Sequence, residues 1–146
     1  MNSVRVKNNL VISSSDDNTV QVWNMQRQEK LWGSDLGDEA NCIILRGDQV
    51  ITCCRDKSVR VFALESGEEL YRLEHLGPCN NADLSPNKSL LAVACGSAVV
   101  LWDIRKAVKI EQFDLGASIC DLQFNSSGDK VLAGSGDGQI FKIDLL

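Results

Sequence analysis

A repeat of about 40 residues constrains the fold of this chain more than any other feature. Four bulky side chains recur at this interval, at Trp23, Phe62, Trp102 and Ile143. A second, upstream set of apolar side chains recurs at the same interval, at Val6, Leu45, Leu84 and Phe124. Because two independent markers keep one period, the sequence predicts four repeats of similar length, each of which is one structural unit.

Each repeat shows the pattern of short β-strands. In the second repeat, runs of apolar and β-branched residues at 42–45, 50–54, 59–62 and 69–73 are separated by turns rich in Gly, Asp and Ser. Residues 90–94 are all apolar, whereas residues 108–113 alternate between apolar and polar side chains. Continuous apolar character indicates a strand covered on both faces, and alternation indicates that one face meets water. We therefore predict an all-β chain, built as a stack of small sheets with polar outermost strands.

The repeats resemble those of the WD-repeat family, in which each unit of about 40–45 residues forms one four-stranded blade of a β-propeller. The matching residues are the aspartates six positions before the bulky side chain, Asp17, Asp56 and Asp137, and the pair Trp102-Asp103. The resemblance implies one propeller segment over 1–146, with repeats at approximately 1–36, 37–75, 76–115 and 116–146. We expect a partial propeller of about four blades, the last of which lacks its outer strand.

The polar network that holds a blade of this family together is incomplete here. In the family, the turn aspartate bonds a histidine from the loop that enters the blade, a Ser or Thr, and the Trp indole. The single histidine, His75, precedes the third repeat, and that repeat carries Gly96 in place of the aspartate. We therefore expect Asp17, Asp56 and Asp137 to be structural turn residues, in blades held mainly by apolar stacking.

The number of repeats leaves the closure of the ring open. Members of the family usually close with about seven blades, and propellers as a class have roughly 4 to 8. The chain is then a segment of a longer propeller protein, a half-ring that a second copy or a partner completes, or an unusually small closed propeller.

Little in the sequence favours catalysis, and we expect no enzyme activity, no cofactor and no metal site. One histidine limits acid–base chemistry, and a turn position for His75 favours a structural role. The six cysteines contain no C-x-x-C pair and cannot complete a zinc-finger ligand set with one histidine. We interpret them as reduced, mostly buried thiols. The glycine-rich segment 134–138 aligns with the turns of the other repeats and lacks the ending of a phosphate-binding loop.

Charge and apolar patterning narrow the class of partner. The net charge of −5 argues against direct binding to nucleic acid or to an anionic membrane, both of which favour a basic surface. The longest apolar stretch, 90–102, is shorter than the roughly 20 residues that a membrane-spanning helix needs. The first residues lack the apolar core of a signal peptide, so we expect a cytoplasmic or nuclear protein.

Recognition of other proteins remains as the expected function. The resemblance implies a non-catalytic scaffold or adaptor that binds partners at the propeller rim, and self-association that completes the ring is a further expectation. Arg55 is the first rim candidate, because arginine is enriched at interface hot spots, and Asp16, Asn41 and Asn80 are the others. Two narrower alternatives are substrate recognition in a ubiquitin ligase, as in F-box/WD-repeat proteins, and a structural subunit of a larger assembly.

Overall fold

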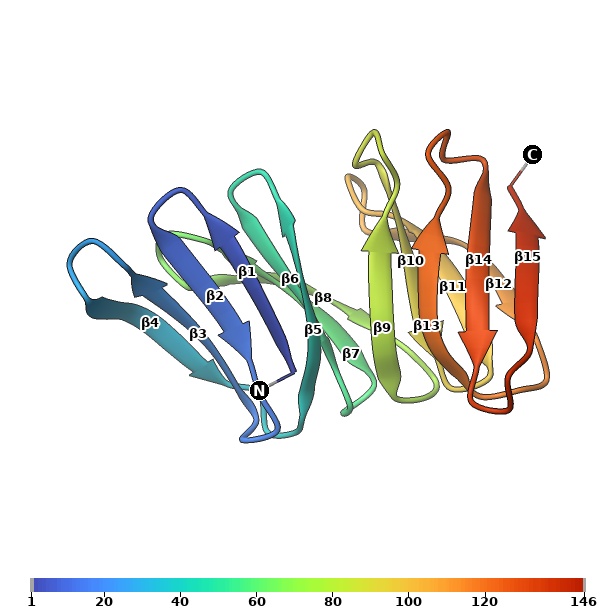
Figure 1. Cartoon of the computed structure of the whole chain (residues 1–146), viewed down its shortest axis with the longest axis horizontal. Helices are drawn as coiled ribbons and strands as arrows, with labels where there is room; N and C mark the ends of the chain where they lie inside the picture. The colour runs from blue at the N-terminus through green and yellow to red at the C-terminus, as the bar shows by residue number, and fades with distance from the viewer. Residues whose placement is uncertain (1, 146) are drawn as a thin grey trace. The chain divides into compact units, whose positions relative to one another are not determined.

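The computed structural model of the chain describes residues 2–145, which form fifteen β-strands and no helix (Figure 1). The strands make four antiparallel sheets, and within each sheet neighbours in sequence are neighbours in space. The last sheet has three strands and the others have four, so the predicted all-β fold and its shortened final sheet are confirmed. Among these residues there is no helix of the length and apolarity needed to cross a membrane.

The chain divides into two compact units of two sheets each, Met1–His75 and Leu76–Leu146. The sheets of the first unit contain β1 (Ser3–Lys7), β2 (Leu10–Ser14), β3 (Thr19–Asn24) and β4 (Glu29–Asp35), then β5 (Ala40–Arg46), β6 (Gln49–Cys54), β7 (Ser58–Ala63) and β8 (Glu69–Glu74). Those of the second contain β9 (Cys79–Leu84), β10 (Leu90–Cys95), β11 (Ala98–Asp103) and β12 (Val108–Asp114), then β13 (Ile119–Phe124), β14 (Lys130–Ser135) and β15 (Ile140–Asp144).

In the first unit the two sheets pack face to face. Buried side chains from both sheets form one core: Ile12, Val20, Val22, Leu36, Ala40, Ile43, Val50, Cys54, Phe62 and Leu64. Trp32 of β4 closes the outer side of this core, with its ring centroid 5.7 Å from that of Phe62. Its indole Nε1 donates to the Leu64 carbonyl at 2.7 Å, so the side chain is fixed at both its apolar and its polar end.

The second unit is built in the same way. Its core joins β10 and β11 to the last sheet through Ala92, Ala94, Val99, Leu101, Ile119, Leu122, Phe124, Val131, Ala133 and Ile143. Side chains also fasten the inner strands of its two sheets, since Asp83 of β9 accepts from the Phe124 amide of β13 at 2.8 Å.

One irregularity recurs between the third and fourth strands of the three four-stranded sheets. The pairing register shifts next to the bulky position that marks each repeat, at Val22/Trp23, Val61/Phe62 and Leu101/Trp102. A bulge of this kind adds one residue to one strand and increases the local twist. The repeated sequence position thus corresponds to a repeated point in the structure.

Candidate functional site

Three polar segments of the first unit lie along one edge of its sheets. The Ala40 amide donates to the Ser15 carbonyl at 3.2 Å, and the Arg55 amide donates to the Glu39 carbonyl at 2.9 Å. These two bonds place the β2–β3 turn, the loop that enters β5, and the β6–β7 turn side by side. We call this the polar edge of the first unit.

Two of the predicted rim residues, Arg55 and Asp16, lie on this polar edge. Arg55 Nη1 lies 3.1 Å from Glu39 Oε1, and the Arg55 side chain is still 58% exposed. Asp16 Oδ1 accepts from Asn2 Nδ2 at 2.6 Å, and the same amide nitrogen donates to the Ala40 carbonyl at 2.9 Å. Both charged groups are therefore accessible to a partner and are positioned by neighbouring segments.

The two asparagines differ in their surroundings. Asn41 is half-buried at the start of β5, directly after the Ala40 residue of the polar edge. Asn80 lies in the second unit, where its Nδ2 donates to the Ile119 carbonyl of β13 at 3.0 Å. This bond fastens β9 to β13, which favours a structural role for Asn80 over the predicted one in binding.

The turn aspartates accept hydrogen bonds from Ser or Thr hydroxyls close in sequence. Asp17 Oδ1 accepts from the Thr19 amide at 3.0 Å and from its hydroxyl at 2.6 Å, and these bonds hold the pKa of Asp17 below its ordinary value. Asp56 makes the same two contacts with Ser58. Asp137 instead accepts from the hydroxyl of Ser135, the residue that precedes its turn.

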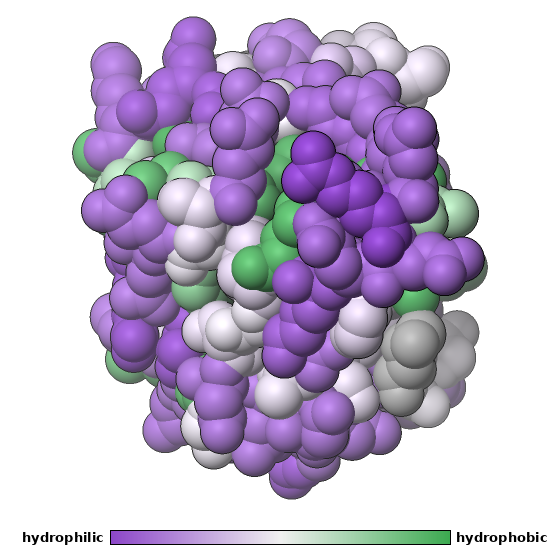
Figure 2. All heavy atoms as spheres, turned by 90° about the vertical axis from the view of Figure 1, so that its left-hand side faces the viewer, coloured by the Kyte–Doolittle hydropathy of each residue, from purple (hydrophilic) through white to green (hydrophobic). Residues whose placement is uncertain are grey.

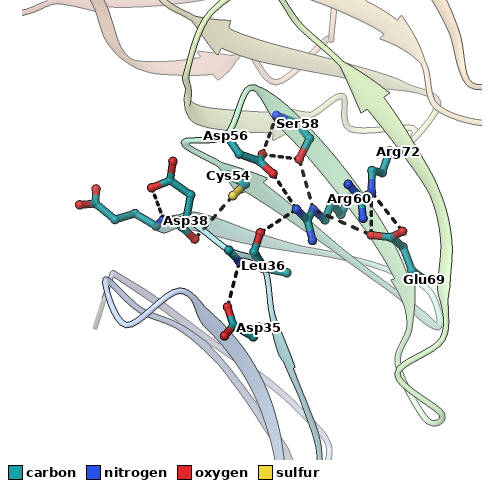
Figure 3. Close-up of polar contacts among 11 residues, drawn as sticks. Asp35, Leu36, Asp38, Cys54, Asp56, Ser58, Arg60, Glu69 and Arg72 are labelled. Carbon is teal, nitrogen blue, oxygen red and sulfur yellow. Dashed lines mark hydrogen bonds and ion pairs between the residues drawn. The ribbon is translucent and has the colours of Figure 1, made fainter.

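Arg60 forms a network in the second sheet that the sequence analysis did not predict (Figure 3). This β7 side chain is 8% exposed, and its Nη2 donates to Asp56 Oδ2 at 2.6 Å and to the Leu36 carbonyl at 2.7 Å. Its Nε donates to Ser58 Oγ at 3.2 Å. The Arg60 guanidinium thus donates to both the turn aspartate and the serine. In the family pattern, a histidine and a Trp indole bond the turn aspartate instead.

The charges of this network alternate in sign. Arg60 Nε lies 3.8 Å from Glu69 Oε1, and Arg72 Nε donates to both Glu69 oxygens at 3.0 and 3.1 Å. Burial raises the pKa of Asp56, but the bonds from Ser58, Arg60 and Cys54 together outweigh it, so this pKa lies below its ordinary value. Asp56 is therefore ionised at neutral pH and balances the buried cation.

The position of Arg60 in the strand indicates the face of the sheet to which its side chain points. Alternate residues of a strand share a face, so Ser58, Arg60 and Phe62 point to the same side of β7. Phe62 stands at the bulky position of the repeat and is buried in the first core. The sequence Val59-Arg60-Val61 resembles a half-exposed strand, which hid the burial of Arg60.

The polar edge can recognise a partner through charge and hydrogen bonds. Within residues 2–145 no three side chains of His, Cys, Asp or Glu are grouped as metal ligands. Asp16 and Asp17 are exposed along this edge beside the Arg55–Glu39 pair. The edge therefore presents the Arg55 guanidinium to acidic groups and several carboxylates to basic groups.

Comparisons with known proteins show what this chain is similar to. A family model described as "WD domain, G-beta repeat" matches residues 2–24 and 111–144. The computationally designed Ika4 protein, a β-propeller, superposes with a TM-score of 0.87 at 22% identity, over 99% of this chain and 90% of that one. This likeness identifies the fold as that of a β-propeller.

Three curated relatives illustrate the sequence similarity. The chain is 29% identical over 109 residues to the small ribosomal subunit protein RACK1 of Drosophila melanogaster, covering 72% of this chain and 34% of that protein. It is 32% identical over 98 residues to the U3 small nucleolar RNA-associated protein 15 homolog of Gallus gallus, covering 66% and 19%. It is 25% identical over 89 residues to eukaryotic translation initiation factor 3 subunit I of Schizosaccharomyces pombe, covering 60% and 27%. The chain thus spans between 19% and 34% of the lengths of these relatives.

Proposed function

Because the chain belongs to the WD-repeat family, we propose that it is a non-catalytic interaction scaffold that binds another protein at the polar edge of its first unit. The observation that carries the proposal is the Arg55–Glu39 pair, an exposed guanidinium held at 3.1 Å by a carboxylate of the neighbouring loop. Side chains positioned before binding lose less conformational freedom when a partner docks. Asp16 and Asn41 belong to the same proposed surface.

The relatives support a role within a larger assembly. Their names describe a ribosomal subunit protein, a small nucleolar RNA-associated protein and a subunit of an initiation factor. We propose protein contacts for this chain rather than direct contacts with nucleic acid, since its net charge is −5 and its polar edge is acidic. The relatives also favour a structural subunit over substrate recognition in a ubiquitin ligase. Their names are consistent with a cytoplasmic or nuclear location, including the nucleolus.

A charge reversal tests the polar edge. In Arg55→Glu the new carboxylate faces Glu39, so binding of a partner at this edge should weaken at least about tenfold, as for a hot-spot residue. Arg105→Glu is the matched control, because Arg105 is 59% exposed and pairs with Asp103 at 3.5 Å on another turn. Proteins cross-linked to wild type and to both variants in cells would be quantified by mass spectrometry.

The proposal predicts that a defined set of proteins is lost with Arg55→Glu and kept with Arg105→Glu. The thermal midpoint of Arg55→Glu should stay near that of wild type, because the pair is exposed and contributes little to stability. A lower midpoint with unchanged partners would contradict the assignment of Arg55 to binding.

A further inference from the structure

Two cysteines of the second unit face each other across neighbouring strands. Cys79 of β9 is the register partner of Cys95 of β10, next to a bulge at Asn80 where the pairing register shifts. The Gly96 amide donates to the Pro78 carbonyl at 3.1 Å. The backbone hydrogen bond therefore joins residues 78 and 96, which are next to the two cysteines in sequence. The cysteines therefore form a non-hydrogen-bonded pair, the type of antiparallel pair in which the side chains are closer together. Cross-strand neighbours of this kind are within reach of a disulfide.

The two thiols also converge on one acceptor. Cys95 Sγ lies 3.2 Å from the carbonyl oxygen of Gly77, and Cys79 Sγ lies 4.0 Å from the same atom. Both side chains are buried, but Cys95 borders a pocket of about 270 Å³ that Leu76 and Ser97 also line. A molecule about the size of water occupies roughly 30 Å³, so a small oxidant can enter this pocket.

The preceding sheet provides a contrast at the same position. Cys54 ends β6 as Cys95 ends β10, and its Sγ lies 3.6 Å from the Asp38 carbonyl oxygen, but its register partner is Ala40. Burial raises the pKa of Cys54 to about 11. The bond from Cys79 outweighs burial at Cys95 and lowers its pKa to about 6. Because the thiolate is the nucleophile, Cys95 is activated near neutral pH and Cys54 is not.

We propose that Cys79 and Cys95 are a redox-modification site that closes to a cross-strand disulfide with hydrogen peroxide as the oxidant. The Cys95 thiolate attacks one peroxide oxygen, the O–O bond breaks, and the departing hydroxide takes up a proton to become water. Cys95 is then a sulfenic acid. The Cys79 sulfur attacks it, the S–O bond breaks as the S–S bond forms, and the second hydroxide leaves as water with the Cys79 proton. Two thiols are oxidised and one peroxide is reduced to two waters.

Oxidation changes the segment that enters the third sheet. A disulfide carries no S–H, so neither sulfur can donate to the Gly77 carbonyl after oxidation. The Gly96–Pro78 backbone bond and the β9–β10 register remain. The site is independent of the polar edge, which belongs to the first unit, and its failure would leave the proposed binding function unaffected.

Peroxide treatment of the full chain tests the site. Wild type would be exposed at pH 7 to a small excess of hydrogen peroxide, alkylated without reduction, digested, and mapped by mass spectrometry. We expect one new linked peptide joining Cys79 to Cys95, with two hydrogens lost, and a fall from six free thiols to four. Dithiothreitol should restore all six thiols.

Two variants separate the steps. Cys79→Ala should stop at the sulfenic acid of Cys95, which dimedone would label, and Cys54→Ala should form the disulfide at the wild-type rate. The measurement on wild type decides the proposal even if a variant fails to fold. Six intact thiols after treatment, or oxidation confined to the exposed Cys120, would overturn it.

Discussion

Arg60 joins three segments of the first unit through one buried cation. It bonds the β6–β7 turn at Asp56, the loop that enters the second sheet at Leu36, and β7 itself at Ser58. The Arg60 side chain is 8% exposed, and its positive charge is stable there because each of these acceptors faces it. The same set of bonds fixes the loop and the turn within the polar edge.

Replacing Arg60 with methionine should strongly destabilise the chain. Met has a similar length and no charge, so Asp56 and the Leu36 carbonyl would lose their donor inside the protein. We expect the free energy of unfolding to fall by about 3–5 kcal/mol, as when one partner of a buried ion pair is removed. Urea unfolding at pH 7 measures this change. Arg72→Met is the control, because Arg72 is 44% exposed and its pair with Glu69 should contribute at most about 1 kcal/mol.

The lowered pKa of Asp56 makes part of this stability depend on pH. A carboxyl whose pKa is lower in the folded state than in the unfolded state stabilises the fold above the unfolded pKa, about 3.9, and this contribution is lost as pH falls through the folded pKa. The stability difference between wild type and Asp56→Asn should therefore be largest at neutral pH and shrink below about pH 4. Urea midpoints measured between pH 7 and pH 3 test this. A difference that stays constant would show that Asp56 does not act through its charge.

At the scale of the strand, one glycine controls the fit between the two sheets of the first unit. Gly67 follows β7 with a φ of 74°, and a Cβ added there would lie 2.6 Å from Cδ2 of Trp32. The indole cannot move away without weakening its 2.7 Å bond to the Leu64 carbonyl or its contact with Phe62. The β7–β8 turn and β4 of the neighbouring sheet thus lie so close together that position 67 has no room for a Cβ.

Gly67→Ala should lower the free energy of unfolding by about 2–4 kcal/mol, since left-handed strain and the clash with Trp32 add together. Gly37→Ala is the control, because Gly37 also has a positive φ of 81° but no atom within 4 Å of an added Cβ. It should cost only about 1–2 kcal/mol. Urea unfolding followed by tryptophan fluorescence measures both variants. Equal losses in the two variants would contradict the role of Trp32.

The sequence predicted the strands better than the polar contacts. Its period located all four sheets. Arg60 was missed because strand alternation does not show whether a neighbouring sheet covers the polar face. The sequence predicts Asn80 for the rim, but its side chain bonds Ile119, 39 residues away, and sequence spacing alone does not reveal such a contact.

At the scale of the whole molecule, each unit exposes apolar side chains on one outer sheet face. In the first unit Ile12 and Val22 point into the core, so their neighbours Val6, Val11 and Trp23 lie on the opposite face, where Trp23 is 40% exposed. Figure 2 shows hydrophilic side chains surrounding smaller hydrophobic patches on the side of β1–β4. A face of this kind is typical of a surface that another protein covers.

The outer face of the last sheet carries exposed apolar side chains among polar ones. Ile140 is 79% exposed and Leu132 is 47% exposed, and both line a pocket of about 250 Å³ on the side opposite the core. Among residues 2–145, no fourth strand pairs with β15, so its outer backbone groups are open as well. Open edges and apolar faces favour pairing with another chain.

The self-association expected from the sequence predicts a dimer, with twice the 16.0 kDa mass of one chain, by light scattering of purified protein. Ile140→Lys should shift the population toward 16.0 kDa, because a charge would have to be buried in the contact. Leu76→Lys is the matched control, since Leu76 is 86% exposed but lies outside the strands of either face. A wild-type chain that stays monomeric at 16.0 kDa and unfolds cooperatively would contradict self-association and leave both faces to a different partner.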